Sequence, residues 1–225
     1  MTSIGVIGTG DMGHALAVRL TGLGRLVHVA NSRGPDTLES LARSVGPLAL
    51  AGTAADVAAG DGTPGRIVFL AIPFGRYDTL ESAPFEGALV VDAGNYDIGR
   101  DGHHPRLDSG AMTTGQVLAA QLPGATVVKA FNTIWYRRIL EESRPDAAHE
   151  DRLAVPVASD DPAARRRISA LVHEMGFAPV DGGTLAQSAR QEYGSLVFNQ
   201  PVGPARAEEL LATDRGAASR DRKEE

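Results

Sequence analysis

Residues 4–13 constrain the fold of this chain more than any other segment. They read Ile-Gly-Val-Ile-Gly-Thr-Gly-Asp-Met-Gly, a short apolar run followed by Gly8, Gly10 and Gly13 at the spacing G-x-G-x-x-G. Helical spacing of apolar residues continues from position 12 to position 20. Gly8 permits a tight turn, Gly10 lets the backbone approach a diphosphate, and Gly13 lets the helix pack closely on the strand. The segment therefore predicts the strand, turn and helix of a dinucleotide-binding site.

The end of the expected second strand, residues 26–30, indicates which dinucleotide binds. An NAD site usually places a carboxylate there, which accepts a hydrogen bond from the 2′-hydroxyl of the adenosine ribose. This chain has Asn31, Ser32 and Arg33 instead, and the first acid is Asp36. A hydroxyl and a guanidinium suit a 2′-phosphate, because Arg forms paired, charge-assisted hydrogen bonds to phosphate. We therefore expect NADP rather than NAD; the alternative is that Arg33 is a solvated residue of a surface turn.

The other apolar runs predict an α/β architecture. Residues 67–72 are continuously apolar, as expected of a parallel strand that is covered on both faces. Further runs and helical patterns alternate along the chain: we expect strands at 47–51, 67–72, 88–93, 125–130, 153–158 and 177–180, and helices at 37–45, 53–59, 116–122, 163–174, 185–191 and 205–212. This order predicts a Rossmann-type, doubly wound, mostly parallel sheet with a small C-terminal αβ extension.

The same patterns suggest a division of the chain. We expect residues 1–150 to form an NADP-binding Rossmann domain and residues 151–203 to form a small C-terminal αβ extension of the same domain. Residues 204–225 are rich in Ala, Glu, Arg and Asp and end in a charged run. Apart from the helix expected within it, this last segment is predicted to be a partly disordered tail.

Composition excludes several classes of protein. The chain has 225 residues with 22 Lys+Arg against 28 Asp+Glu, a formal net charge of -6, and no basic stripe beyond residues 165–167, which disfavours nucleic-acid binding. It has no cysteine, so disulfides and thiolate chemistry are excluded. The first residues show no basic region followed by a long apolar run, and no apolar run reaches about 18 residues, so we expect neither a signal peptide nor a membrane span. We expect a soluble cytoplasmic protein that does not associate with membranes.

In a doubly wound sheet, ligands lie beyond the carboxyl ends of the strands. Ile72, Pro73 and Phe74 follow one strand and are expected beside the diphosphate or the nicotinamide ribose, although Phe74 can equally be a core residue. Asn95 follows the next strand, where it orients a ribose or an amide or simply forms a turn. Residues 97–114 are long and irregular, which is typical of a lid or a ligand loop.

A third strand end supplies the candidates for the chemistry. Lys129 and Asn132 lie where a substrate would meet the nicotinamide, and they are predicted with Tyr96 to position the reactants. If the substrate is a carbonyl or an imine, the candidate proton donors are Tyr96, Lys129, His103 and His104. Trp135 is either a buried aromatic residue or a stacking surface for a planar substrate. No metal site is predicted, because the two histidines have no carboxylate at a ligand spacing.

Four motifs in this order resemble the NADPH-dependent coenzyme F420 reductase-like family. They are the glycine turn, Asn-Ser-Arg-Gly-Pro at 31–35, Val-Val-Lys-Ala-Phe-Asn-Thr at 127–133, and Gly-Phe-Ala-Pro-Val-Asp-Gly-Gly at 176–183, and the likeness runs from about residue 2 to residue 192. The resemblance implies a Rossmann domain, often in a homodimer, and hydride transfer between NADP and a second small-molecule substrate. In the type members that substrate is an 8-hydroxy-5-deazaflavin.

The resemblance also implies roles for individual residues. Thr9, Gly10, Asp11 and Met12 would line the diphosphate, and Ser32 and Arg33 the 2′-phosphate, as residues of one cofactor site. Family members usually carry Asn where Asp11 stands and a basic residue where His14 stands, and a carboxylate repels a diphosphate unless it caps the helix. Residues 95–104 and 191–194 look like a broader branch of dinucleotide-binding proteins.

We therefore expect an NADPH-dependent oxidoreductase, with coenzyme F420 as a candidate second substrate. A deazaflavin ring carbon accepts hydride directly, so the protein needs to position two rings and exclude water rather than supply an acid or a base. One alternative is an NADPH-dependent imine or ketone reductase of a biosynthetic pathway. Another is a non-catalytic NADP-binding sensor.

Overall fold

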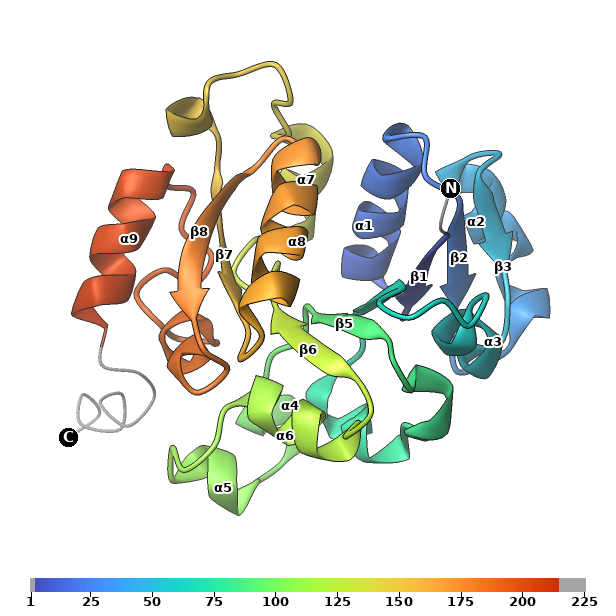
Figure 1. The fold of residues 1–225 in the computed structure, drawn as a ribbon, viewed down its shortest axis with the longest axis horizontal. Coiled ribbons are helices and arrows are strands. Elements are labelled where there is room, and N and C mark those ends of the chain that lie inside the picture. The colour runs from blue at the N-terminus through green and yellow to red at the C-terminus, as the bar shows by residue number, and fades with distance from the viewer. Residues whose placement is uncertain (1–2, 215–225) are drawn as a thin grey trace.

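The computed structural model describes residues 3–214, and within them eight strands form one sheet in the order β3-β2-β1-β4-β5-β6-β7-β8 (Figure 1). The strands are β1 Ile4–Ile7, β2 Val27–Ala30, β3 Ala49–Ala51, β4 Ile67–Leu70, β5 Leu89–Asp92, β6 Thr126–Lys129, β7 Ala154–Ala158 and β8 Ala178–Gly183. The α-helices are α1 Asp11–Gly22, α2 Glu39–Val45, α3 Ala54–Ala59, α4 Ile98–Asp101, α5 Pro105–Asp108, α6 Thr114–Gln121, α7 Tyr136–Glu141, α8 Pro162–Glu174 and α9 Pro204–Thr213.

Strands β1 to β6 are all parallel to one another. The chain runs outward from β1 through β2 to β3, and then returns to the other side of β1 with β4, β5 and β6. The strand order therefore reverses beside β1, and ligands of doubly wound sheets bind at such a switch point. This arrangement confirms the Rossmann-type, mostly parallel α/β fold predicted from the sequence.

The C-terminal strands extend the same sheet through a small junction. β7 pairs with β6 in the antiparallel direction at one position, Lys129 with Ala158, whereas β7 and β8 are parallel and pair along their length. Ser159 strengthens the junction, since its hydroxyl donates to the carbonyl oxygen of Val127 at 2.7 Å. The division into residues 1–150, 151–203 and 204–225 stays a prediction, but the sheet itself is continuous across the first boundary.

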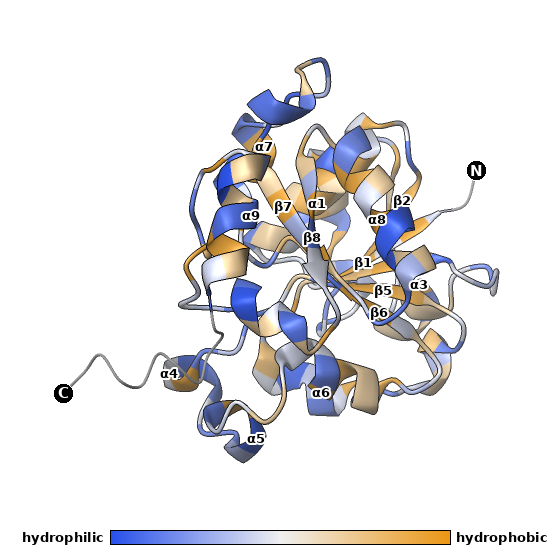
Figure 2. Ribbon diagram, turned by 60° about the vertical axis from the view of Figure 1, so that its left-hand side comes forward, coloured by the Kyte–Doolittle hydropathy of each residue, from blue (hydrophilic) through white to orange (hydrophobic). Residues whose placement is uncertain are grey.

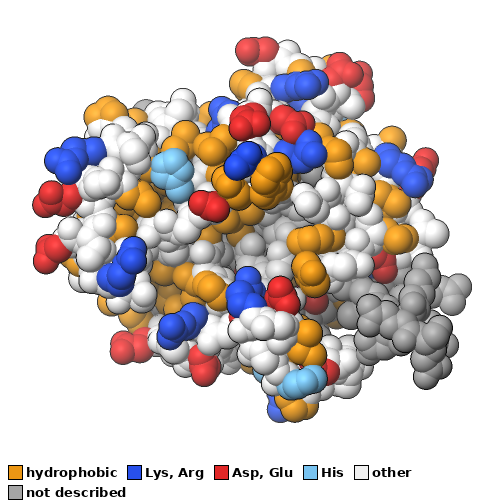
Figure 3. Space-filling view, turned by 180° about the vertical axis from the view of Figure 1, so that it is seen from behind, with side chains coloured by type: hydrophobic (Ala, Val, Ile, Leu, Met, Phe, Trp, Pro, Cys, Tyr) orange, Lys and Arg blue, Asp and Glu red, His pale blue; other side chains and the backbone are white. Residues whose placement is uncertain are grey.

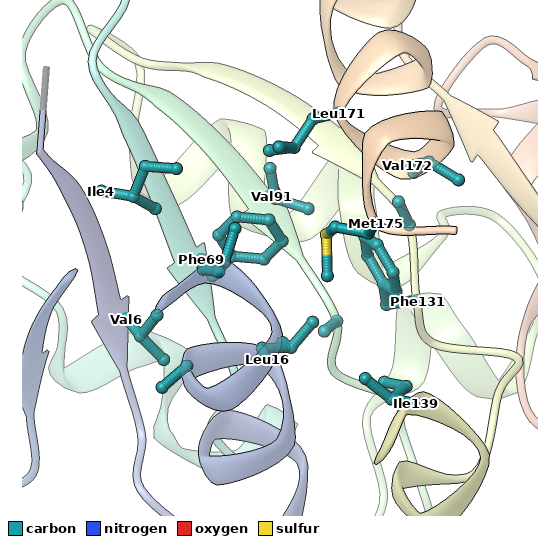
Figure 4. Close-up of a cluster of buried hydrophobic side chains, with 14 of the residues drawn as sticks. Ile4, Val6, Leu16, Phe69, Val91, Phe131, Ile139, Leu171, Val172 and Met175 are labelled. Atoms are coloured by element: carbon teal, nitrogen blue, oxygen red, sulfur yellow. The ribbon is translucent and has the colours of Figure 1, made fainter. Parts of the chain in front are cut away.

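Helices cover both faces of the sheet, and each face has its own apolar core. The first core lies under α1, α2, α7 and α8, and its side chains converge from the strands and these helices (Figure 4). The second core lies on the opposite face and gathers side chains of α3, α5 and α6. Because successive strand residues point to opposite faces, neighbours on one strand enter different cores: Phe69 belongs to the first and Leu70 to the second. The central strands are accordingly hydrophobic, while the helices carry both hydrophilic and hydrophobic residues (Figure 2).

Several element boundaries differ from those expected. Residues 97–114 are not uniformly irregular, because they contain the short helices α4 and α5. The helix expected at 185–191 is a 3₁₀ turn over Gln187–Gln191. The helix expected at 205–212 is present as α9, and its residues Ala207 and Leu211 pack against Val180 of β8. The disorder predicted for the end of the chain concerns residues 215–225, which lie outside the described residues. Across residues 3–214, no helix combines the length and the apolar character needed to span a bilayer.

Candidate functional site

The glycine turn between β1 and α1 is built by close backbone contacts. Gly8 has φ +99°, a conformation that favours glycine, and its N–H donates to the carbonyl oxygen of Ala30 at 2.8 Å. A Cβ atom at Gly8 would lie 2.2 Å from the carbonyl oxygen of Ala71, and one at Gly13 would lie 1.8 Å from the carbonyl oxygen of Gly8. A Cβ atom at Gly10 would meet no other part of the described chain within 4 Å. Packing therefore requires Gly8 and Gly13, whereas Gly10 borders open space.

That open space lies at the N-terminus of α1. Gly10 is the N-cap residue, and no side chain caps the helix there. The first N–H groups of a helix have no intrahelical partner, and the positive end of the helix dipole points in the same direction. Thr9 and Met12 are partly buried around the turn, while Asp11 is exposed in its first helical position. Uncapped N–H groups facing open space suit a phosphate group.

The end of β2 presents a loop built by Asn31. Its side-chain oxygen accepts from the N–H of Arg33 at 2.8 Å, and its amide nitrogen donates to the hydroxyl of Thr37 at 3.0 Å. Asn31 therefore shapes the turn that presents Ser32 and Arg33, and both of these residues are exposed. No hydrogen bond or ion pair to another described residue holds the guanidinium of Arg33, so it remains available to an anionic ligand.

The segment after β4 contributes backbone rather than an aromatic side chain. Ile72 is partly buried and Pro73 is exposed. The ring of Phe74 is 7% exposed and packs against the rings of Tyr77 at 5.1 Å and Tyr96 at 5.3 Å. The interpretation of Phe74 as a core residue is confirmed, because its ring belongs to the second apolar core.

The ends of β5 and β6 are locked together by two asparagines. Asn132 Nδ2 donates to Asn95 Oδ1 at 3.0 Å, and Asn95 Nδ2 donates to the carbonyl oxygen of Asn132 at 2.8 Å. Asn132 also donates to the carbonyl oxygen of Gln191 at 2.6 Å and accepts from Gln191 Nε2 at 3.1 Å. The preceding residue, Phe131, has φ +63°, which is strained for a bulky side chain and turns the chain into this network. Asn132 is buried and thus holds the ends of β5 and β6 and the backbone at Gln191 together.

A buried charge network joins the same ends of β5 and β6. Lys129 has no exposed side-chain atom, and its Nζ donates to Asp92 Oδ2 at 2.8 Å, to the carbonyl oxygen of Gly94 at 2.5 Å and to Thr114 Oγ1 at 2.8 Å. The hydroxyl of Tyr77 donates to the other carboxylate oxygen of Asp92. Burial and the Asp92 carboxylate raise the pKa of Tyr77 well above its usual value. All three N–H bonds of Lys129 are satisfied, so it positions the strand ends and does not reach a substrate.

Tyr96 binds residues 97–114 rather than facing the crevice. Its hydroxyl lies 2.5 Å from Asp108 Oδ1 and 2.8 Å from the carbonyl oxygen of Gly102, and it accepts from the N–H of His104 at 3.1 Å. Burial and the hydrogen bond to Asp108 raise the pKa of Tyr96. His103 also contacts Asp108, at 3.1 Å, and is highly exposed. Tyr96 and His103 therefore form hydrogen bonds within a surface segment, whereas the His104 ring packs edge-on against Phe74 and its buried Nδ1 has no hydrogen-bond partner among the described residues.

The docking of residues 97–114 is expected to weaken in acid. Burial alone would raise the pKa of Asp101, but hydrogen bonds from Arg100 and from the N–H groups of Asp97 and Gly75 lower it overall. The pKa of Asp108 is also lowered, chiefly by the hydrogen bond from Tyr96. A carboxylate whose pKa falls on folding stabilises the fold fully above its unfolded pKa, about 3.9 for Asp, and this contribution is lost as pH falls through the folded pKa.

Thermal unfolding measured from about pH 6 down to about pH 3 checks this dependence. The variant Asp101→Asn should be less stable than the wild type at the upper end, and the difference should shrink as the pH falls. A constant difference over the whole range would contradict the assignment of the acid response to Asp101.

The only tryptophan of the chain, Trp135, is exposed. Its side chain is 44% accessible at the N-cap of α7, so the alternative that it is a buried core residue is wrong. Seen from behind, the surface of the molecule is hollowed near its centre, and hydrophobic, basic and acidic side chains gather along the upper rim (Figure 3). An exposed aromatic ring of this size marks a candidate contact for a ligand.

Sequence reasoning missed the partners of the strand-end residues. Asp92 and Lys129 each end an apolar strand, and they are direct neighbours in the register of β5 and β6. Buried charges occur in pairs, so two opposite charges at the ends of buried strands were a usable signal for the ion pair. Gln191 gave no such signal, because its contact with Asn132 depends on how the C-terminal segment folds back.

Comparison with known proteins identifies the family. Residues 3–96 match the family described as NADP oxidoreductase, coenzyme F420-dependent. A hypothetical protein from Sinorhizobium meliloti has a crystal structure with 31% sequence identity and a TM-score of 0.75, over 90% of this chain and 96% of that chain. The part of the chain from residue 3 to residue 96 belongs to this F420-dependent NADP oxidoreductase family. Its fold and sequence are those of NAD(P)-binding oxidoreductases.

Two further proteins are similar to this chain. The metalloreductase STEAP3 from Rattus norvegicus is 31% identical over 192 residues, which cover 84% of this chain and 35% of that protein. The chain thus spans about a third of the length of this curated relative. A crystal structure described as an F420-dependent NADP reductase from Arthrobacter sp. FB24 shares the fold, with 24% identity, a TM-score of 0.68, and coverage of 94% of this chain and 91% of that chain.

Proposed function

We propose that this protein is an NADPH-dependent oxidoreductase that transfers hydride between NADP(H) and a second small-molecule substrate. The observation that supports the cofactor most directly is the pairing of an uncapped glycine turn with the free guanidinium of Arg33 at the same edge of the sheet. The turn suits the diphosphate, and Ser32 with Arg33 suits a 2′-phosphate. The end of β2 carries Asn31 where an NAD site would place a carboxylate.

The proposed cofactor site divides among the strand ends. Thr9, Gly10, Asp11, Met12 and Gly13 surround the diphosphate, Asn31 shapes the loop that binds the 2′-phosphate, and Ile72, Pro73, the backbone of Phe74, and Asn95 lie toward the nicotinamide ribose. When bound, NADPH supplies the hydride. The protein's own residues orient the dinucleotide and exclude water, and Asn132, Lys129 and Tyr96 act as positioning residues.

The positions of Lys129 and Tyr96, two of the four candidate proton donors, favour an acceptor that takes hydride at a ring carbon. Lys129 is fully buried, and the hydroxyl of Tyr96 is held by Asp108 and its neighbours. Reduction of a carbonyl or imine needs a proton donor near the acceptor, whereas a deazaflavin does not. We therefore propose an 8-hydroxy-5-deazaflavin such as coenzyme F420 as the second substrate, bound near Asn95 and Asn132.

A spectroscopic assay tests this proposal. NADPH and oxidised F420 are mixed with the protein, and absorbance is followed at the bands of the reduced nicotinamide and the oxidised deazaflavin, with flavins, ketones and imines as parallel substrates. Turnover with F420 supports the proposal. Turnover with an imine or ketone alone makes the protein a reductase of that class, and tight NADPH binding without any turnover makes it a sensor. The homodimer and the cytoplasmic location implied at the sequence level stay predictions.

Replacing Arg33 by alanine is expected to weaken NADPH binding by about 10- to 100-fold, the loss of one to two charge-assisted hydrogen bonds, while NADH binding changes little. Calorimetric titration of both nucleotides measures the difference. Arg166→Ala is a matched control, because Arg166 is an exposed arginine on α8, and it should leave both affinities unchanged. Equal losses for NADPH and NADH in Arg33→Ala would refute the 2′-phosphate assignment.

A further inference from the structure

Helix α7 places a cation beside the glycine turn. α1 follows β1 and α7 follows β6, so both helices start at the carboxyl edge of the parallel sheet, and they pack against each other. Arg19, near the C-terminal end of α1, donates from Nε to the carbonyl oxygen of Ile139 at 2.7 Å and from its terminal nitrogen to that of Leu140, near the C-terminal end of α7. The two helices thus pack against each other, and both begin at the edge of the sheet that carries the glycine turn.

Arg137 lies in the first turn of α7 and has only weak partners. Its guanidinium carbon is 5.0 Å from the ring centroid of Trp135 and 6.0 Å from that of Tyr136, and its Nε donates to the Tyr136 hydroxyl at a long 3.3 Å. The side chain is exposed. The hydrogen bond to Tyr136 raises the pKa of Arg137, and the carboxylates of Glu141 and Asp11 add to the rise. Arg137 is therefore an exposed cation within electrostatic reach of Asp11.

The carboxylate of Asp11 would repel the proposed diphosphate, and the positive charge of Arg137 can offset that repulsion. It is exposed in the first turn of α1, next to Gly10, where the proposed diphosphate would lie. A carboxylate and a neighbouring diphosphate repel each other because both are negatively charged, and the repulsion grows where water is excluded. Arg33 cannot offset it, because it belongs to the end of β2 and is assigned to the 2′-phosphate.

We propose that Arg137 is a phosphate-binding residue of the cofactor site, which exchanges its contacts with the rings of Trp135 and Tyr136 for an oxygen of the NADP(H) diphosphate. The inference rests on the proposed function, because it needs a dinucleotide at the glycine turn. A guanidinium forms charge-assisted hydrogen bonds with phosphate that are stronger than its contact with an exposed ring. The exchange uncovers the face of Trp135 on the side of the second substrate, so cofactor binding prepares the stacking surface.

The affinity of NADP⁺ tests the phosphate contact. Calorimetry is used with NADP⁺ and with 2′-AMP, a probe that has the 2′-phosphate and lacks the diphosphate. Arg137→Ala and Arg137→Gln should bind NADP⁺ about 10- to 100-fold more weakly than the wild type and 2′-AMP equally well. Arg138→Ala is the matched control, because the neighbouring Arg138 pairs with Glu142 at 2.5 Å, and it should not change NADP⁺ binding. Asp11→Asn should strengthen NADP⁺ binding.

Fluorescence of the single tryptophan tests the exchange itself. In the wild type, NADP⁺ should change the emission of Trp135 as the guanidinium leaves the ring. Free Arg137→Ala should already show the emission of the uncovered ring, and its further change on saturation with NADP⁺ should be smaller. NADP⁺ affinity of Arg137→Ala and Arg137→Gln within about twofold of the wild type overturns the inference while leaving the proposed function intact. Failure of the wild type to bind either NADP⁺ or 2′-AMP overturns the proposed function, and the inference falls with it.

Discussion

Replacing Lys129 by methionine is expected to lower the free energy of unfolding by about 3–5 kcal/mol, the usual cost of breaking a buried ion pair from one side. The side chains of Lys129 and Asp92 are both 0% exposed, so the variant would leave an uncompensated carboxylate among apolar strands. It would also leave the carbonyl oxygen of Gly94 without its donor. Methionine fills a similar volume, which separates the loss of charge from the loss of packing.

Urea denaturation followed by circular dichroism measures this change in stability, and two further variants serve as controls. Arg206→Ala removes an ion pair whose side chains are 61% and 65% exposed, and should change stability by no more than about 1 kcal/mol. The double variant Asp92→Asn, Lys129→Met removes both charges and should recover part of the loss, since replacing a whole buried pair is less costly than breaking it. A change of less than about 1 kcal/mol in Lys129→Met would show that the network does not hold the strand ends together.

Two glycine substitutions in the same turn are expected to separate folding from cofactor binding. Gly13→Ala places a Cβ 1.8 Å from the carbonyl oxygen of Gly8, and because both partners are backbone, α1 must move away from β1. We expect a loss of about 3 kcal/mol or more in stability, at the upper end of the cost of overpacking. NADP⁺ affinity should fall with it, because the turn is distorted.

Gly10→Ala is expected to behave differently, since its φ of -71° suits any residue and a Cβ there meets no other part of the described chain. Stability should stay within about 1 kcal/mol of the wild type, the range of an N-cap change. NADP⁺ affinity should nevertheless fall on the order of 100-fold, because the methyl group would occupy the space where the backbone approaches the diphosphate. Calorimetry and thermal unfolding of the two variants measure both quantities. Tight NADP⁺ binding by Gly10→Ala would place the diphosphate elsewhere.

The features predictable from the sequence are those set by local spacing. The glycine turn follows from residues 8–13 because Gly8 adopts a positive φ and Gly13 packs directly against the carbonyl oxygen of Gly8. The parallel core follows from apolar runs such as residues 67–72, because a strand covered on both faces has no polar positions. The loop at Asn31 is local as well, since the side chain bonds to Arg33 and Thr37. For these elements the neighbours in the chain are also the neighbours in the fold.

The features that sequence reasoning missed depend on distant contacts. Tyr96 follows a strand end, but its hydroxyl is turned outward by Asp108 after the chain has looped back. Arg137 is one arginine among many in the sequence, and its place beside the glycine turn follows from the packing of α7 on α1. The buried state of Lys129 required knowing that β5 and β6 are neighbours in register. The strand ends that carry the candidate site could therefore be predicted from the sequence, whereas the orientation of the side chains at those ends could not, and the site itself stays a prediction.

The pairing between β6 and β7 at a single position is the weakest backbone link in the sheet of the described residues. β6 and β7 pair at one position, whereas β5 and β6 pair along four residues. Because fewer backbone hydrogen bonds hold them to the rest of the sheet, we expect β7, β8 and their helices to unfold locally as one unit. The contact of Asn132 with Gln191 crosses this junction, whereas the glycine turn lies wholly on the other side of it. Local unfolding of the C-terminal strands would thus break the hydrogen bonds between Asn132 and Gln191 while the glycine turn stays folded. We therefore expect the substrate end to open at a lower free energy than the cofactor end, and the substrate end is the one that must admit and release the proposed second substrate.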